Sequence, residues 1–420
     1  MNKLFIKIRS SLSLYFNDPL IKNSYYLMGN TLINASVGFF FWIIAARLYS
    51  SYDIGLGSAI ISSIGLLTLF SLFGFDISLI RFLPSEKNKM DMINSCLFFS
   101  SLINLILVIT FIIGLSIWSP SLIFLQSNLF FGFLFCFFAI LNTLNYLQIS
   151  IFVGLRSAKH SLFQSIPNFF RILFLPILIS IGTLGIYSSF GLSYLISFLL
   201  GNRLISHIIP EYKIRLSLKR NIVYKLFSYS LGNYIANIFI NLTNFLLPLI
   251  VLNSVGANLN AYFYISWTFS SILLMIPFSI SRSLLAEISY SKDTFYDNVK
   301  KSLSFSLLLL GGSLILILFL GKYLLLLFGK EYSLNSFEPL LIFSIASIPY
   351  AVNQIYITIK RLEKKIKPVI IIYLTISMIT IIISYMFIKQ YGLNIIGYAW
   401  LFSNSFIAIL LIIKRFWRKS

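Results

Sequence analysis

One charged side chain lies deep inside a stretch of sequence that is apolar enough to cross a membrane. Arg171 stands within residues 161–181, about ten residues, or roughly 15 Å of helix, from the start of that stretch. Even lenient insertion scales assign a cost of about 2.5–3.5 kcal/mol to arginine at the bilayer centre. A guanidinium can bind a phosphate through two parallel hydrogen bonds, which makes Arg171 a candidate phosphate-binding residue. The alternative is a buried ion pair with Asp76 or with a carboxylate of another span.

Carboxamide side chains recur at helical spacing in several apolar segments. Such amides either hold helices together or line a hydrated cavity, where they can meet sugar hydroxyls. Their recurrence in both halves of the chain favours a cavity. The candidate substrate-binding residues are Arg171 with Gln164 and Asn168 at the preceding turns, Asn30 and Asn34, and the stripe Asn233, Asn237, Asn241 and Asn244.

Signatures of catalysis and metal binding are missing from the sequence. There is no G-x-S-x-G, Walker A or H-E-x-x-H pattern. His160 and His207 are the only histidines, and neither has a Cys, Asp or Glu at ligand spacing. We therefore expect a protein that is not an enzyme and that binds no metal or cofactor.

The composition is typical of a protein that crosses the membrane many times. Of 420 residues, 58% are hydrophobic and only 11% are charged, whereas soluble domains keep roughly a quarter of their residues charged. The sequence predicts an all-α polytopic membrane protein with twelve transmembrane helices in two six-helix lobes. The expected spans are residues 24–46, 56–80, 93–117, 128–152, 161–181, 185–202, 226–252, 259–281, 302–327, 338–358, 368–388 and 393–413.

Basic residues collect on one side of these spans. The net charge of +21 would indicate nucleic acid as a partner in a soluble chain. With the N-terminus inside, however, twenty-eight Lys and Arg lie in the tails and inner loops, and only Arg47, Lys322, Lys330 and Lys389 lie outside. The positive-inside rule then predicts that both termini are cytoplasmic, and it explains the charge without nucleic acid.

The same reading divides the chain into five parts. Residues 1–23 are predicted to form a cytoplasmic amphipathic segment, residues 24–208 an N-terminal lobe, 209–225 a cytoplasmic linker, 226–413 a C-terminal lobe and 414–420 a basic cytoplasmic tail. A repeat is expected between the lobes, because Gly29-Asn30 and Asn34 align with Gly232-Asn233 and Asn237 at an offset of 203.

Residues 29–84 carry the elements of a family resemblance. They include Ala46-Arg47-Leu48-Tyr49, then Ser51-Tyr52-Asp53-Ile54-Gly55, then Gly74-Phe75-Asp76 before Ile80-Arg81-Phe82. This pattern resembles the opening of the Wzx-type polysaccharide and O-antigen lipid flippases of the MOP transporter superfamily.

The resemblance implies a multi-pass protein of the inner, cytoplasmic membrane that moves a lipid-linked oligosaccharide on a polyprenyl diphosphate carrier by alternating access. Membrane lipids and other polysaccharide-assembly proteins are the implied partners, in O-antigen and lipopolysaccharide biosynthesis. Arg171 best matches the basic cavity residues of that family. Arg47, Arg81 and Arg282 are candidates for the places where the head group enters and leaves, and Asp76 and Glu287 are candidates for ion coupling.

Two alternatives remain open. A MATE-like multidrug or cation antiporter would share the fold but would be expected to carry deep acidic residues. A membrane-embedded glycan polymerase would need catalytic groups on a sizeable outer loop, whereas the outer loops expected here are short.

Overall fold

A computed structural model describes residues 19–290 and 295–417, and regular structure in these ranges is entirely helical. Residues 1–18 of the predicted amphipathic segment 1–23 lie outside the described ranges, as do the last three residues of the basic tail, and residues 19–23 belong to α2 (Pro19–Leu48). The longer helices are α2 (Pro19–Leu48), α3 (Ser51–Ser71), α5 (Lys89–Ile113), α8 (Leu129–Gly154), α11 (Thr183–Ile208), α12 (Arg220–Val255), α13 (Ala257–Tyr290), α14 (Phe295–Leu325), α16 (Phe337–Leu362), α17 (Ile366–Tyr391) and α18 (Asn394–Trp417). The shorter ones are α4 (Phe75–Phe82), η1 (Leu83–Ser85), α6 (Leu115–Trp118), η2 (Pro120–Leu122), α7 (Phe124–Ser127), α9 (Ala158–Ser165), η3 (Ile166–Phe169), α10 (Phe170–Ile177), η4 (Ile179–Ile181) and α15 (Lys330–Asn335).

The eleven longer helices of the described ranges are each long and apolar enough to cross a membrane. Their surfaces agree with that setting, since large apolar side chains such as Leu129, Leu308 and Phe319 are exposed. Contiguous apolar surface of this kind is unfavourable in water and is stable against lipid. The protein is therefore a multi-pass membrane protein.

A twelfth crossing follows from the direction of α8 and α11. Phe138 of α8 contacts Tyr187 of α11, Asn145 bonds to the carbonyl of Tyr194, and Gln148 bonds to that of Phe198. Residue numbers rise together along both helices, so the helices run parallel. The chain between them must return across the membrane, and it does so through α9, η3 and α10.

This crossing corrects the expected continuous span at residues 161–181. The segment consists of two eight-residue helices with the 3₁₀ turn η3 between them. Pro167 lies in η3. Proline has no backbone N–H and its ring clashes with the preceding turn, which explains why a regular helix does not continue through this point. Arg171 follows in the first turn of α10.

The expected span at residues 56–80 is also divided, between α3 and α4. Gly74 has φ +74, and a Cβ atom there would lie 2.5 Å from Ser230 Oγ of α12. The turn therefore needs glycine both for its left-handed backbone and for the close approach of α12. Asp76 and Arg81 lie on the short helix α4 that follows.

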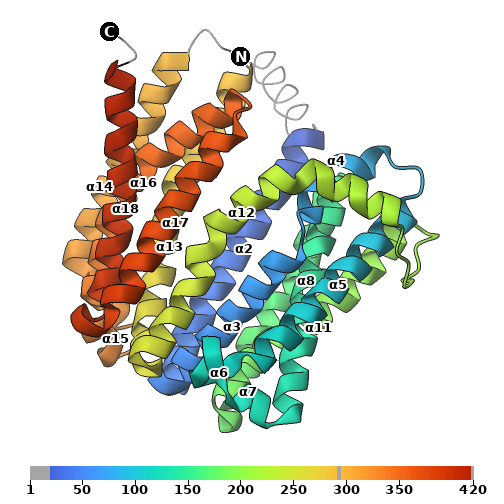
Figure 1. Ribbon diagram of the computed structural model, residues 1–420, viewed down its shortest axis with the longest axis horizontal. Helices are drawn as coiled ribbons and strands as arrows, with labels where there is room; N and C mark the ends of the chain where they lie inside the picture. The colour runs from blue at the N-terminus through green and yellow to red at the C-terminus, as the bar shows by residue number, and fades with distance from the viewer. Residues whose placement is uncertain (1–18, 291–294, 418–420) are drawn as a thin grey trace, which may run out of the picture.

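The helices form two groups that α12 connects. Figure 1 shows α2–α11 on one side and α13–α18 on the other, with α12 running between them. We call these groups the N-lobe and the C-lobe, and we count α12 with the C-lobe because it packs along α17 and α13. The start of α2 and the end of α18 lie at the same end of the molecule, as an even number of crossings requires.

The same packing recurs in both lobes. In the N-lobe, Gln164 of the fifth crossing donates to Asn145 of α8 at 3.2 Å. In the C-lobe, Tyr373 of α17 donates to Gln354 of α16 at 3.2 Å, and each partner stands 209 residues after its counterpart. The two lobes therefore share this contact between neighbouring helices.

The lobes meet closely at the end opposite the termini, which the charge distribution predicts to face outward. A Cβ atom on Gly55 of α3 would lie 1.8 Å from the carbonyl oxygen of Ala257 at the start of α13. Asn260 Nδ2 donates to Gly55 O at 2.7 Å, and Ser51 Oγ lies 3.2 Å from Asn258 Oδ1. Only glycine allows this approach of backbone to backbone. We call these residues the outer contact.

Candidate functional site

Arg171 lies buried where α10, α11 and α13 come together. Its Nε donates to the carbonyl of Asn168 at 2.9 Å, and its Cζ stands 4.7 Å from the ring centroid of Phe190. Tyr194 of the N-lobe and Tyr264 of the C-lobe interact with it electrostatically. The guanidinium therefore sits between the lobes, with aromatic neighbours and a single hydrogen-bonded partner.

The charge of Arg171 has no carboxylate partner. No ion pair to it is formed among residues 19–290 and 295–417, and the pair with Asp76 considered above is not made there. Its two terminal nitrogens make no hydrogen bond in the same ranges. An uncompensated buried cation is costly, because its desolvation is not offset by a counter-charge. The site is thus suited to an anion that would supply the missing charge and accept both terminal N–H groups.

A chain of amides leads from α2 to Arg171. Asn34 Nδ2 donates to Asn30 Oδ1 at 2.6 Å, and Asn168 Nδ2 donates to Asn34 Oδ1 at 2.7 Å. Asn168 then accepts from Arg171 through its backbone carbonyl. Four of the predicted residues therefore converge in one network, and that network fixes the position of the guanidinium.

Gln164 belongs to a neighbouring cluster that holds helices together. Its Nε2 donates to Asn145 Oδ1 at 3.2 Å and to Gln148 Oε1 at 2.6 Å, while its carbonyl accepts from Ser197. The cavity beside this cluster has a volume of only about 90 Å³, room for about three waters. At this position the amides bind one another and leave little space for a ligand. We call this cavity the N-lobe pocket.

The four asparagines of α12 do not act as one set. Asn233 is exposed, and Asn241 donates to Asn237 Oδ1 at 3.1 Å, as Asn34 does to Asn30. Asn244 lines a cavity of about 200 Å³ inside the C-lobe and makes no hydrogen bond within the described ranges. Of this stripe, only Asn244 combines a free carboxamide with a pocket.

The three arginines at span ends differ in their surroundings. Arg47 Nε donates to Leu327 O at 2.8 Å and its Nη2 donates to Leu326 O, so it joins α2 to the end of α14 in the other lobe. Arg81 is exposed and lines a cavity of about 540 Å³ together with Arg156. Arg282 is exposed, with its Cζ 5.4 Å from the ring centroid of Phe278.

The two carboxylates considered for ion coupling lie apart. Asp76 is buried in the first turn of α4 and accepts hydrogen bonds from the local backbone. Glu287 is exposed near the end of α13. Within the described ranges no three His, Cys, Asp or Glu residues come together as a metal site would require.

Aromatic residues around Arg171 were not predicted from the sequence. Trp42 of α2 stacks edge-on with Tyr264 at 4.8 Å, and Phe190 and Tyr194 cover the guanidinium from α11. The only sequence pattern that points to them is the i, i+4 spacing of Phe190 and Tyr194 on α11. In a chain with 42 Phe and 24 Tyr, such spacing is too common to identify a site.

Comparisons with known proteins identify the fold. No protein-family model and no curated protein sequence matches the chain. Among solved structures, the lipid II flippase MurJ in an inward closed conformation matches with a TM-score of 0.74 at 17% identity, covering 93% of this chain and 87% of that one. An inward-facing multidrug resistance MATE family transporter of the MOP superfamily matches with a TM-score of 0.69 at 14% identity, over 89% and 92% of the two chains. The chain therefore has the fold of MOP-superfamily transporters.

An outward-facing MATE family transporter of the superfamily also matches, with a TM-score of 0.62 at 15% identity, covering 93% of each chain.

Proposed function

We propose that this protein, with its MOP-transporter fold, is a flippase that moves a lipid-linked oligosaccharide across the cytoplasmic membrane by alternating access. The substrate is a glycan repeat unit on a polyprenyl diphosphate. The observation that carries this proposal is Arg171, a buried cation whose two terminal nitrogens have no partner in the described part of the chain. A diphosphate supplies the charge and the acceptor oxygens that this guanidinium lacks.

The contacts between the lobes support an inward-facing resting state. On α2, Phe39 and Trp42 contact Phe269 and Tyr264 of α13, and Arg47 binds the carbonyls after α14. All of these lie in the second half of α2, toward the outer contact. The substrate would therefore reach Arg171 from the cytoplasmic side, and the outer contact would have to separate for release.

The wider role follows from the class of substrate. Glycans on polyprenyl diphosphates are precursors of surface polysaccharides such as O-antigen, and other polysaccharide-assembly proteins would receive the product. The cavity that Arg81 shares with Arg156 is a candidate for the first contact with the anionic head group, because two guanidinium groups lie at its surface.

A MATE-like antiporter is the second candidate, since such transporters share this fold. Cation coupling by that route would depend on acidic residues inside a lobe. Asp76 is the one buried carboxylate of the described ranges, and it lies on α4, not beside Arg171. The positive charge at the centre therefore favours an anionic substrate over a cationic drug.

The proposal can be tested by surface glycan in a bacterial host that lacks its own flippase. We expect Arg171→Ala to abolish export while protein levels are maintained, and Arg171→Lys to restore it in part because lysine keeps the charge but loses the bidentate geometry. Asn221→Ala, an exposed position on α12, is the matched control and should export normally. Full export by Arg171→Ala would contradict the proposal.

A further inference from the structure

The C-lobe contains a pocket whose chemistry differs from that around Arg171. It has a volume of about 200 Å³ and lies between α12, α13, α16, α17 and α18. We call it the C-lobe pocket. Its lining includes four aromatic side chains and two carboxamides, namely Trp267, Tyr350, Tyr373, Trp400, Asn244 and Asn404.

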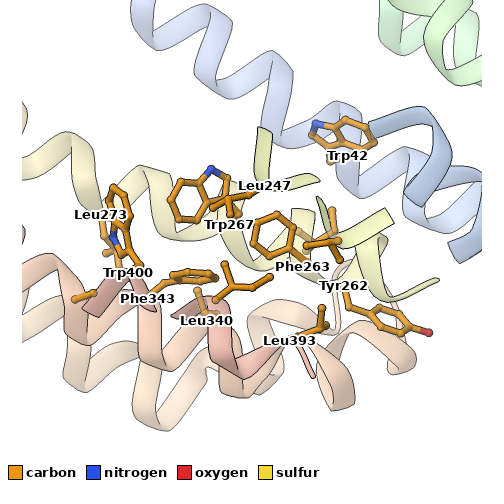
Figure 2. Packing of buried hydrophobic residues seen from close by; sticks show 14 of the residues in the cluster. Trp42, Leu247, Tyr262, Phe263, Trp267, Leu273, Leu340, Phe343, Leu393 and Trp400 are labelled. Atoms are coloured by element: carbon orange, nitrogen blue, oxygen red, sulfur yellow. The ribbon is translucent and has the colours of Figure 1, made fainter. Parts of the chain in front are cut away.

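Two indole rings form walls of the C-lobe pocket. The centroids of Trp267 and Trp400 are 5.3 Å apart with their planes at 83°, and Tyr350 lies 6.3 Å from Trp400 at a shallower angle. Figure 2 shows Trp267 between Trp400 on one side and Trp42 on the other. Trp400 is buried, and its Nε1 has no hydrogen-bond partner in the described ranges. This nitrogen has almost no accessible surface, so Trp400 contributes to the pocket lining through atoms other than its N–H.

Polar groups in the same pocket are free to bind. The carboxamide of Asn244 makes no hydrogen bond in the described ranges, and it can donate two bonds and accept two. The pocket lining includes no acidic or basic residue. A cation or an anion would find no counter-charge there, whereas a neutral ligand with both apolar faces and hydroxyl groups would be complementary.

A sugar ring has this combination of surfaces. Its C–H faces pack on aromatic rings, and its hydroxyls bond to amides such as that of Asn244. The volume of the pocket corresponds to about seven waters at liquid density. That is the space of one monosaccharide, not of an extended glycan.

The C-lobe pocket lies at a suitable distance from Arg171. Tyr264, which neighbours the guanidinium, and Ser271, which lines the pocket, are seven residues apart on α13, a rise of about 10 Å along the helix. A diphosphate joined to its first sugar spans a length of the same order. One substrate can therefore place its diphosphate at Arg171 and its first sugar in the pocket.

We propose that the C-lobe pocket binds the first sugar ring of the transported glycan, with Trp267 and Trp400 against the faces of the ring and Asn244 bonded to its hydroxyls. This inference rests on the proposed function, and it adds a division of labour between the lobes. The N-lobe holds the charged carrier through Arg171, and the C-lobe selects the sugar. Substrate choice should then depend on C-lobe residues.

The test measures binding of two kinds of probe to the full-length protein in lipid nanodiscs. One probe is farnesyl diphosphate without sugar. The others are farnesyl diphosphate bearing a single hexose, N-acetylhexosamine or deoxyhexose. The variants are Asn244→Ala, which removes the carboxamide, and Trp400→Leu, which removes an aromatic wall of the pocket but keeps an apolar side chain. Asn221→Ala at an exposed position of the same helix and Trp118→Leu at the exposed Trp118 of α6 are the matched controls.

We expect at least one sugar to raise the affinity of the wild-type protein, and each variant to lower the affinity for that probe about fivefold, as expected for the loss of one hydrogen bond or one aromatic contact. Affinity for the sugar-free probe should stay unchanged in the variants, which also shows that they are folded. The inference is overturned if none of the three sugars adds affinity, or if both variants keep the full gain. A wild-type protein that does not bind the sugar-free probe at all would instead contradict the proposed function.

Discussion

The pockets of the two lobes differ in size and in the hydrogen bonding of one amide beside each. The N-lobe pocket is about 90 Å³ in volume, and Gln164 beside it is bonded to Asn145 and Gln148. The C-lobe pocket is about 200 Å³ in volume, and Asn244 beside it is free. The repeated helix packing therefore supports a closed polar cluster in one lobe and an open aromatic pocket in the other.

The two lobes also differ in charge at corresponding positions. Arg171 of the N-lobe corresponds, by the offset of 209 residues seen in the packing, to Thr380 of α17. The Thr380 hydroxyl bonds to Ser403 at 2.8 Å, so the C-lobe has a neutral, saturated group where the N-lobe has a cation. A duplicated scaffold has thus given one lobe the charge and the other the binding surface for a neutral group.

This difference teaches that amide side chains must be judged by their partners and not by their number. Both lobes carry buried Asn and Gln that bond to protein groups and stabilise the packing, such as Gln164 in the N-lobe and Asn353 in the C-lobe. A residue with unmet hydrogen-bonding capacity beside a cavity is the better candidate for ligand binding.

The largest effect is expected from charge reversal at Arg171. Arg171→Glu replaces attraction with repulsion at the proposed diphosphate site, and affinity for farnesyl diphosphate should fall about 100-fold or more. Arg171→Gln, which removes the charge without adding repulsion, should give a smaller loss. The affinity for farnesyl diphosphate is measured with each purified protein in nanodiscs. Equal affinities of the wild type, Arg171→Glu and Arg171→Gln would remove the electrostatic basis of the N-lobe site.

A pair of substitutions separates packing from binding. Gln164→Leu should lower the free energy of unfolding by about 2 kcal/mol, because it leaves Asn145 and Gln148 without their buried partner. Asn244→Leu should change it by less than about 0.5 kcal/mol, since the side chain has no partner to lose. The free energies of unfolding of the two variants are measured in mixed micelles and compared with that of the wild type. The distinction between the lobes fails if Asn244→Leu proves the more destabilising.

A smaller effect is expected at the outer contact. Arg47→Ala removes two hydrogen bonds between α2 and the carbonyls after α14, which should favour separation of the lobes at that end. A cysteine placed at Asn258 should then react about fivefold faster with a membrane-impermeant thiol reagent. Arg282→Ala, at an exposed arginine on α13, serves as the control. An unchanged rate in Arg47→Ala would show that these bonds do not hold the contact closed.

Much of the fold was predictable because a membrane imposes simple requirements on a chain. Each crossing needs a long apolar helix with internally bonded backbone, so hydropathy alone located the span at 338–358 within α16 (Phe337–Leu362). The break at Pro167 was not predicted. Proline removes one hydrogen bond in any helix, but the neighbouring helices decide whether the result is a bend or a 3₁₀ turn.

The candidate site was predictable only in part. Helical spacing placed Gln164, Asn168 and Arg171 on one face of the fifth crossing, and the structure brings Asn34 to the same place. Spacing within a helix cannot show which distant residue becomes a partner. The bonds of the Gln164 Nε2 group join residues of different helices, so the contrast between a bonded Gln164 and an Asn244 with no hydrogen bond in the described ranges emerges only from the packed structure.

The most direct test of the central claim uses liposomes that contain the purified protein and a fluorescent polyprenyl-diphosphate-linked oligosaccharide in both leaflets. An impermeant quencher added outside bleaches only the outer leaflet. We predict that the wild-type protein makes nearly all of the label accessible, whereas Arg171→Ala leaves the inner-leaflet half protected, as in protein-free liposomes. The account would be contradicted if the inner-leaflet label stayed protected in liposomes with the wild-type protein. It would also be contradicted if the label became accessible at the same rate with the wild-type protein and with Arg171→Ala.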